Sequence, residues 1–330
     1  MSGLQKSGGV LLALIAIAAA GAPAISPHSP VQQFGDYGNA PPMPPRIVHT
    51  NGSIGRPFVY PLRLVNRLER RYEEDRTRPM PIEWFSAGAI ATIDESAGPW
   101  LPLGGDPLGR DVLARLLHGA RLSLGVAFAA SIGALALGLL VGGVAGLAGG
   151  RVDRVLMGIA DFVLVLPAIY LVLAVRASLP LVLSVFQVFA ALTLLLAAAG
   201  WPIPARGVRA IVAAERQKQY AEAALAVGAG PVRILLCHLL PATRAFVLAI
   251  WTAILPAFVL TEATLSFVGL GFPSPEATWG VMLRDGWQAG ALVSAPWLIT
   301  PAAAIVVTVL ALHLLTSVPA DSGPQAGTFS

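Results

Sequence analysis

The second apolar stretch of the chain, residues 122–147, reads LSLGVAFAASIGALALGLLVGGVAGL and carries no charged side chain. A helix needs about 20 mostly apolar residues to cross the hydrocarbon core of a bilayer, and this stretch exceeds that length. Only a helix or a closed barrel satisfies its backbone hydrogen bonds in lipid, and the stretch lacks the short alternating pattern of a barrel strand. The sequence therefore predicts a membrane-spanning helix here.

Five further stretches pass the same test. They cover residues 8–27, 155–175, 181–200, 245–270 and 291–318. All are rich in Ala, Leu, Val and Gly, and none shows the alternation of a barrel strand. We therefore expect an all-α membrane protein with six transmembrane helices.

The composition excludes the common alternatives. Of the 330 residues, 55% are apolar and 12% are charged, and the mean hydropathy is +0.71, whereas a soluble domain carries about 25% charged residues. A soluble protein and a disordered chain are both excluded. The net charge of +4 is modest, so we expect no nucleic acid partner. A single cysteine, Cys237, and five histidines without ligand spacing predict neither a disulfide framework nor a metal site.

The short loops set the predicted orientation. With a cytoplasmic N-terminus, nine cations fall in inside segments and two in short outside segments, which agrees with the positive-inside rule. The inside cations are Lys6, Arg151, Arg154, Arg206, Arg209, Arg216, Lys218, Arg233 and Arg244, and the outside ones are Arg176 and Arg284. We therefore expect a multi-pass protein of the cell inner (plasma) membrane with both termini in the cytoplasm.

The first apolar stretch has a second interpretation. Lys6, the apolar core of residues 10–20 and the small residues that follow could form a cleaved signal peptide. We favour an uncleaved helix because the apolar run continues to Pro27, and both interpretations place residue 28 outside. The predicted organisation is a first helix over 1–27, an extracytoplasmic loop or subdomain over 28–121, a membrane core of five helices over 122–318, and a tail over 319–330.

The outer segment has two predicted parts. Residues 23–61 are dense in proline, which favours extended or polyproline geometry over a compact core. Residues 62–78 are predicted to form a short charged helix with Val65, Leu68 and Tyr72 on one face. A solvated surface helix and a contact with an external partner are both compatible with that pattern.

A cytoplasmic loop over about 201–244 separates the fourth and fifth predicted spans. We expect it to contain two short helices, the first ended by Gly228, the usual residue for the left-handed position after a helix. Gly230-Pro231 then starts a second helix over 232–240, which is predicted to stop at Pro241. Two helices joined by a tight turn, with small residues on the first, fit a surface that another protein contacts.

This loop resembles a known motif. Glu222-Ala223-Ala224, then Gly228, then His238-Leu239-Leu240-Pro241 is similar to the EAA loop of ABC-importer permeases, in which a coupling helix docks on the ATPase subunit. A histidine at the position of His238 is usual in the peptide-type branch. Residues 104–124, 146–167 and 261–280 also resemble segments of the dipeptide, oligopeptide and nickel permease group. The match is closest to its C-type subunit.

The resemblance implies a type I ABC-importer permease fold and a set of partners. These are a second, B-type permease, one or two ABC ATPases and an extracytoplasmic substrate-binding protein, with the lipid bilayer around the pore. The implied ATPase-coupling residues are Tyr220, Glu222, Ala223, Ala224, Gly228, Arg233, His238, Leu240 and Pro241. No phosphate-binding loop motif occurs in the sequence, so ATP-Mg is expected on the partner ATPases, with no cofactor and no catalytic residue in this chain. The proline-rich loop and the C-terminal tail depart from the family pattern.

Few ionisable side chains fall in the predicted spans. Asp161 and Glu262 are candidates either for lining the translocation path or for structural hydrogen bonding, and His313 is expected to pack or to lie at the membrane interface. A serine hydrolase built on Ser266 and His313 is set aside because small residues surround Ser266. The remaining alternative is an ATP-independent secondary transporter or channel, although the spans carry few of the charges that one needs. Peptides, nickel chelates, opines and glycosides all stay open as substrates.

Overall fold

The computed structural model describes residues 3–48, 54–86, 88–166, 173–174 and 183–316. The helices are α1 (Gly3–Ala20), α2 (Ala22–Ile25), α3 (Val112–Ala148), α4 (Gly150–Val165), α6 (Val185–Gly200), α7 (Pro202–Glu215), α8 (Gln219–Ala226), α9 (Pro231–Ile234), α10 (Arg244–Val268), α11 (Trp279–Gln288) and α12 (Thr300–Thr316). The strands are β1 (Arg46–Val48), β2 (Ile54–Val59), β3 (Leu62–Asn66), β4 (Arg71–Glu74), β5 (Met80–Pro81), β6 (Glu83–Ser86) and β7 (Ala89–Thr92).

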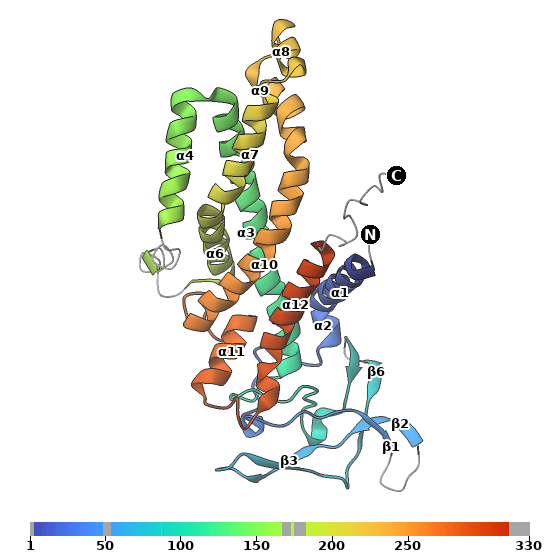
Figure 1. The fold of residues 1–330 in the computed structure, drawn as a ribbon. Helices are drawn as coiled ribbons and strands as arrows, with labels where there is room; N and C mark the ends of the chain where they lie inside the picture. Colours follow the sequence, from blue (N-terminus) through green and yellow to red (C-terminus); the bar gives the residue numbers. More distant parts are fainter. Residues whose placement is uncertain (1–2, 49–53, 87, 167–172, 175–182, 317–330) are drawn as a thin grey trace, which may run out of the picture.

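Helix α3 is 37 residues long, and α6, α7 and α10 pack along it (Figure 1). Asp111 caps its first turn by accepting a hydrogen bond from the amide of Leu113 at 2.8 Å. The helix therefore begins ten residues before residue 122, where the apolar run alone would start it. Glycines on α3 let its neighbours approach closely: a Cβ at Gly142 would lie 2.3 Å from the carbonyl oxygen of Ala205.

The described residues contain four helices long and apolar enough to cross a membrane. They are Gly3–Ala20, Val112–Ala148, Pro231–Val268 and Pro296–Thr316. The pair α6 and α7, bent by 46°, makes a fifth if it counts as one span. The third predicted span, 155–175, runs from α4 into residues outside the described ranges, so six spans stay a prediction.

The helix before α10 differs from its prediction. Pro241 was expected to end a helix, yet Pro231–Val268 continues past it as one 38-residue unit. A π-helical turn over Leu235–Leu239 and a 3-10 turn over Leu240–Thr243 precede the regular α10. These turns re-route the backbone hydrogen bonds around a residue that has no N–H to donate. The prediction of a helix end at Pro241 is therefore wrong.

The segment before α3 is a small β-subdomain rather than extended chain. Its strands are all antiparallel and form three small sheets, ordered β1-β2-β5, β3-β4 and β6-β7. A buried cluster holds them together, and Trp100 donates from its Nε1 to the carbonyl oxygen of Met43 at 3.0 Å. The predictions of an all-α protein and of a proline-rich segment without a core are both wrong here. The chain is nevertheless mostly helical.

The predicted helix over 62–78 is the hairpin of β3 and β4. Leu68, expected on its apolar face, is 97% exposed. The side chain of Asn66 accepts hydrogen bonds from the amides of Leu68 and Glu69, which forms a turn. Arg70 has a φ of +48°, a left-handed conformation that a continuous helix does not allow. Local turn chemistry therefore overrides the apparent helical spacing.

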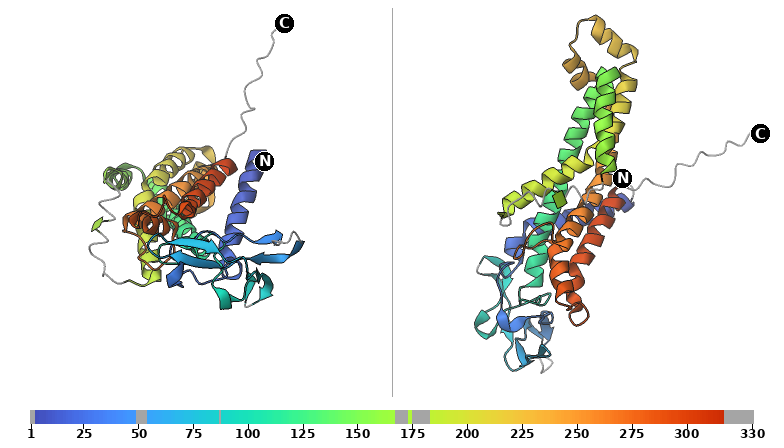
Figure 2. Two further views of the ribbon diagram at one scale, coloured as in Figure 1. Left: turned by 90° about the horizontal axis from the view of Figure 1, so that it is seen from below. Right: turned by 90° about the vertical axis from the view of Figure 1, so that its left-hand side faces the viewer.

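The β-subdomain and the α8–α9 segment lie at opposite ends of the molecule (Figures 1 and 2). Helix α3 starts beside the subdomain and α10 returns from the α8–α9 end. The two aqueous segments expected from the sequence are thus separated by the length of the helical part. The first and last described helices also pack against each other, α1 against α12. A Cβ at Gly8 would lie 2.6 Å from the backbone nitrogen of Leu315.

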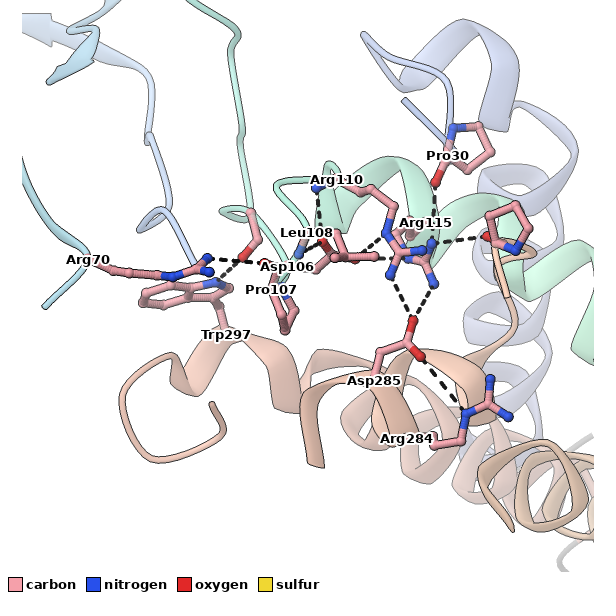
Figure 3. Close-up of polar contacts among 12 residues, drawn as sticks. Pro30, Arg70, Asp106, Pro107, Leu108, Arg110, Arg115, Arg284, Asp285 and Trp297 are labelled. Carbon is pink, nitrogen blue, oxygen red and sulfur yellow. Dashed lines mark hydrogen bonds and ion pairs between the residues drawn. The ribbon is translucent and has the colours of Figure 1, made fainter. Parts of the chain in front are cut away.

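Buried ion pairs join the start of α3 to α11 (Figure 3). Asp285 accepts through Oδ2 from Arg110 at 2.8 Å and from Arg115 at 3.2 Å. Asp106 accepts from the Nε of Arg110 at 2.6 Å and, through its other oxygen, from two backbone amides. Both arginines are fully buried, so the carboxylates are what makes their burial tolerable.

Replacing Asp285 with asparagine is expected to destabilise the protein by about 3–5 kcal/mol, because two buried guanidinium groups lose their shared negative charge. Thermal unfolding in detergent measures this as a lower midpoint. Glu69→Gln is the matched control, since Glu69 is exposed in the β3–β4 turn. Equal midpoints for the two variants would contradict the structural role of Asp285.

Candidate functional site

The candidate site is the α8–α9 segment at the end of the molecule opposite the β-subdomain (Figure 1). Helix α8 ends in a left-handed cap. Gly228 has a φ of +84°, and the amide of Ala229 donates to the carbonyl oxygen of Ala224 at 3.0 Å. This six-to-one hydrogen bond across a left-handed glycine is a Schellman motif. The predicted helix end at Gly228 is therefore confirmed.

A small apolar core fixes α8 to its neighbours. Its buried members are Val208, Val212, Ala221, Ile234, Leu235 and Leu239, contributed by α7, α8, α9 and the π-helical turn. Ala224 packs partly buried against this cluster. Ala221 and Ala224 are the described α8 side chains in this contact, and α8 packs chiefly against α9, the helix that follows. The cluster therefore connects α8 to both of its neighbours in the chain through small side chains.

The outward face of the segment is apolar but open to solvent. Val227 is 90% exposed, Val232 66% and Leu236 57%, while Glu222 and Ala223 are also exposed. Apart from the two chain neighbours of Gly228, no heavy atom of the described residues lies within 4 Å of a Cβ placed there. Exposed apolar side chains grouped at one tip, with room above the glycine, are typical of a protein-binding surface.

A polar bridge closes the turn between α7 and α8. The hydroxyl of Tyr220 donates to one carboxylate oxygen of Glu215 at 2.7 Å, and Lys218 donates to the other at 2.6 Å. Donation to the carboxylate raises the pKa of Tyr220 to about 12. The phenol therefore keeps its proton, and the hydrogen bond persists, throughout the physiological pH range.

The other predicted coupling residues lie beyond the tip. Arg233 and Pro241 are exposed, Leu240 is partly buried against the apolar core, and His238 is partly buried. The Nδ1 atom of His238 has no hydrogen-bond partner among the described residues. The nine predicted residues thus occupy one continuous segment at one end of the molecule, although an interaction of any of them with an ATPase stays a prediction.

Several residues of this site were not predicted from the sequence. Ala221 is the anchor of α8 at 1% exposure, Glu215 holds Tyr220, and Val227, Val232 and Leu236 provide the open apolar face. The position of Ala221 within a short, alanine-rich helix gave no periodic signal. Val227 could have been found from its place directly before the helix-ending glycine, where it is the last side chain of the cap.

The two candidate path residues lie in different environments. Asp161 on α4 is more than half exposed and forms an ion pair with Arg206 on α7. Arg209, about one helical turn after Arg206, pairs with Asp153, about two turns before Asp161, at 2.8 Å. Together the four side chains line a polar cavity of about 700 Å³ between α4 and α7. An open, charged cavity keeps Asp161 a candidate for the translocation path.

Glu262 is instead fully buried within the chain. Its Oε1 accepts a hydrogen bond from the hydroxyl of Ser266 at 2.8 Å. A side chain without exposed surface does not line a path in this conformation, so the geometry favours structural hydrogen bonding for Glu262. His313 lies near the end of α12.

Comparison with known proteins identifies the family. The model of the binding-protein-dependent transport system inner membrane component family matches residues 123–320, which is more than half of the chain. The chain belongs to this family. The family match includes most of α3, the α8–α9 segment and α12, and leaves out the β-subdomain and the start of α3.

Curated relatives of this permease point to one group of importers. It is 36% identical over 213 residues to the oligopeptide transport system permease protein OppC of Bacillus subtilis, covering 64% of this chain and 67% of that protein. It is 36% identical over 225 residues to the dipeptide transport system permease protein DppC of the same organism, covering 68% and 67%. It is also 36% identical over 230 residues to the nickel transport system permease protein NikC of Escherichia coli K12, covering 68% and 77%. The expected resemblance to the oligopeptide, dipeptide and nickel permeases is confirmed.

Gly228→Ala is expected to loosen the end of α8, because a side chain at this left-handed position costs about 1–2 kcal/mol. Amide hydrogen exchange over residues 223–229 measures the loss as faster exchange. Gly230→Ala is the matched control, since Gly230 has an extended backbone with φ of −68° and equal free space. Alanine there is expected to be neutral or slightly stabilising. Equal effects of the two substitutions would contradict the role of the glycine cap.

Proposed function

We propose that this permease is one half of the pore of an ATP-driven importer for peptides or related small solutes, and that its α8–α9 segment couples the pore to the ATPases. The observation that carries the proposal is the open apolar tip formed by Val227, Val232 and Leu236 around the Gly228 cap. The names of the relatives, which are oligopeptide, dipeptide and nickel permeases, support the substrate class.

The contacts of α8 support a mechanism for coupling. The helix lies between the end of α7 and the start of the 38-residue helix that includes α10. Closure of the ATPases on ATP would press on residues 217–228, and the core around Ala221 would pass the movement to both helices. As these two helices tilt, the pore would open to one side of the membrane and close to the other.

Ion pairs extend this moving unit to α4. Asp153 and Asp161 on α4 pair with Arg209 and Arg206 on α7, so α4 would follow α7. The polar cavity between them would then change shape with each cycle. A translocation path beside Asp161 is part of this proposal, and the charges there favour polar solutes over apolar ones.

The remaining parts of the importer lie in other chains. A B-type permease would complete the pore, one or two ABC ATPases would bind ATP-Mg, and an extracytoplasmic binding protein would deliver the solute. The excess of cations around the α8–α9 end favours a cytoplasmic location for it. The β-subdomain would then lie outside, six spans would complete the membrane part, and both termini would be cytoplasmic.

Ala223→Trp tests the coupling role. Ala223 is exposed on α8, so the large ring is expected to leave folding intact and to block an ATPase that docks closely there. We expect less ATPase to co-purify with the permease, and less uptake of labelled di- and oligopeptides and of nickel by cells that carry the full set of subunits.

Val65→Trp is the control, because Val65 is 54% exposed on β3 at the opposite end of the molecule. It is expected to leave both co-purification and uptake unchanged. If Ala223→Trp changed neither quantity, the proposed docking surface would be wrong. If purified permease alone carried out ion-coupled flux in vesicles, an ATP-independent transporter would replace the importer.

A further inference from the structure

The hairpin of β6 and β7 is a feature that the coupling mechanism does not use, and it lies outside the family match. Ten consecutive residues, 84–93, carry no charge between Glu83 and Asp94. The neighbouring β3–β4 region is the opposite, with ten charged residues among the seventeen of 62–78. Within one small subdomain, the β3–β4 hairpin is therefore strongly charged, whereas the β6–β7 hairpin carries no charge between Glu83 and Asp94.

Apolar side chains are exposed on both faces of the β6–β7 hairpin. The register pairs Trp84 with Ala91 and Ser86 with Ala89, so Phe85 and Ile90 point to the other face. Trp84 is 56% exposed, Phe85 83% and Ile90 40%. Ala89 is buried and Ala91 packs against the subdomain core, so the chain covers part of one face. The large apolar side chains Trp84, Phe85 and Ile90 are left uncovered by the chain, which favours an apolar surrounding for them.

The backbone conformation of Phe85 is a second indication that its side chain has a partner outside this chain. Its φ of +56° is left-handed, which is rare for a bulky residue and costs about 1–3 kcal/mol. The ring that this conformation presents is almost fully exposed, so the strain is not offset by burial of the ring within this chain.

The hairpin lies where the chain leaves its first apolar helix. Strand β7 packs against α2, which follows α1 after a single residue, Gly21. Figure 1 shows β6 beside α2, on the side of the subdomain that faces the helices. The outer surface of α1 is itself apolar, with Val10, Leu14 and Ile17 each about 60% exposed. The hairpin therefore lies beside a helix whose exposed surface is apolar enough for lipid.

We propose that the β6–β7 hairpin inserts into the interfacial layer of the bilayer beside α1, with lipid as its partner. Tryptophan and phenylalanine suit this layer because their rings are apolar and the indole N–H can still meet water or head groups. The free strand edges of a two-stranded hairpin need hydrogen-bond partners, which head groups and interfacial water supply and the hydrocarbon core does not. The hairpin thus lies at the interface and fixes the distance of the β-subdomain from the membrane surface. The proposal goes beyond the transport role and does not depend on which side the subdomain faces.

Fluorophore labelling of single cysteines tests the insertion. In a Cys237→Ser background, Phe85→Cys and Leu68→Cys each receive a polarity-sensitive dye, and the full chain is reconstituted in vesicles of phosphatidylethanolamine and phosphatidylglycerol. At position 85 we expect blue-shifted emission, loss of fluorescence to a lipid with a nitroxide near its head group, and protection from aqueous iodide. At position 68, which is 97% exposed in the charged β3–β4 turn, we expect water-like emission and quenching by iodide.

Ile90→Cys gives the same test from the second strand, so the proposal stays testable if Phe85→Cys does not fold. Equal iodide quenching at 68 and at both hairpin positions would overturn it. It would also be overturned if the hairpin dyes became protected only on addition of a second permease subunit or a binding protein. Protection by lipid alone supports it.

Discussion

The carboxylate of Asp285 bonds to two buried arginines, and the junction between the β-subdomain end of the permease and its helices depends on that contact. Arg110 and Arg115 frame the first turn of α3, so α11 is held against the start of α3. Trp297 reinforces the junction by donating its indole N–H to the carbonyl oxygen of Gly105 at 3.0 Å. These contacts tie the segment that leaves the β-subdomain to α11 and to the residues around Trp297 (Figure 3).

The other end of the molecule is built on a different principle. No buried ion pair among the described residues fixes α8; a cluster of small and branched apolar groups does. Ala221 and Ala224 connect α8 to this cluster, while the glycine cap turns the chain sharply into the following helix. A rigid, charged junction at one end and a thin apolar joint at the other fit a protein in which the second end receives force and the first holds still.

The features of the fold and of the candidate site that depend on neighbouring residues could be predicted from the sequence, and those that depend on distant contacts could not. Apolar length predicts the long helices, and Gly228 predicts the end of α8, because both depend on neighbours in the chain. The hairpin over 62–78 was missed because Val65, Leu68 and Tyr72 show helical spacing by coincidence, whereas Asn66 and Arg70 form the turn. The Arg110–Asp285 pair joins residues 175 positions apart, and no pattern in a single sequence reveals such a contact. Pro241 was misjudged because a π-helical turn can absorb the hydrogen bond that proline removes.

The close packing of α1 on α12 bears on how the protein is made. Gly8 lies against the backbone of Leu315, so the first helix has its main partner in the last one. About 280 residues separate the two helices, and a ribosome adding 5–20 residues per second needs roughly 15–60 s to cover that distance. During this time α1 lies in lipid with its α12-facing surface unpaired. The nascent chain therefore completes its membrane bundle only after the final helix emerges, and anything that shields α1 until then protects the chain from misassembly.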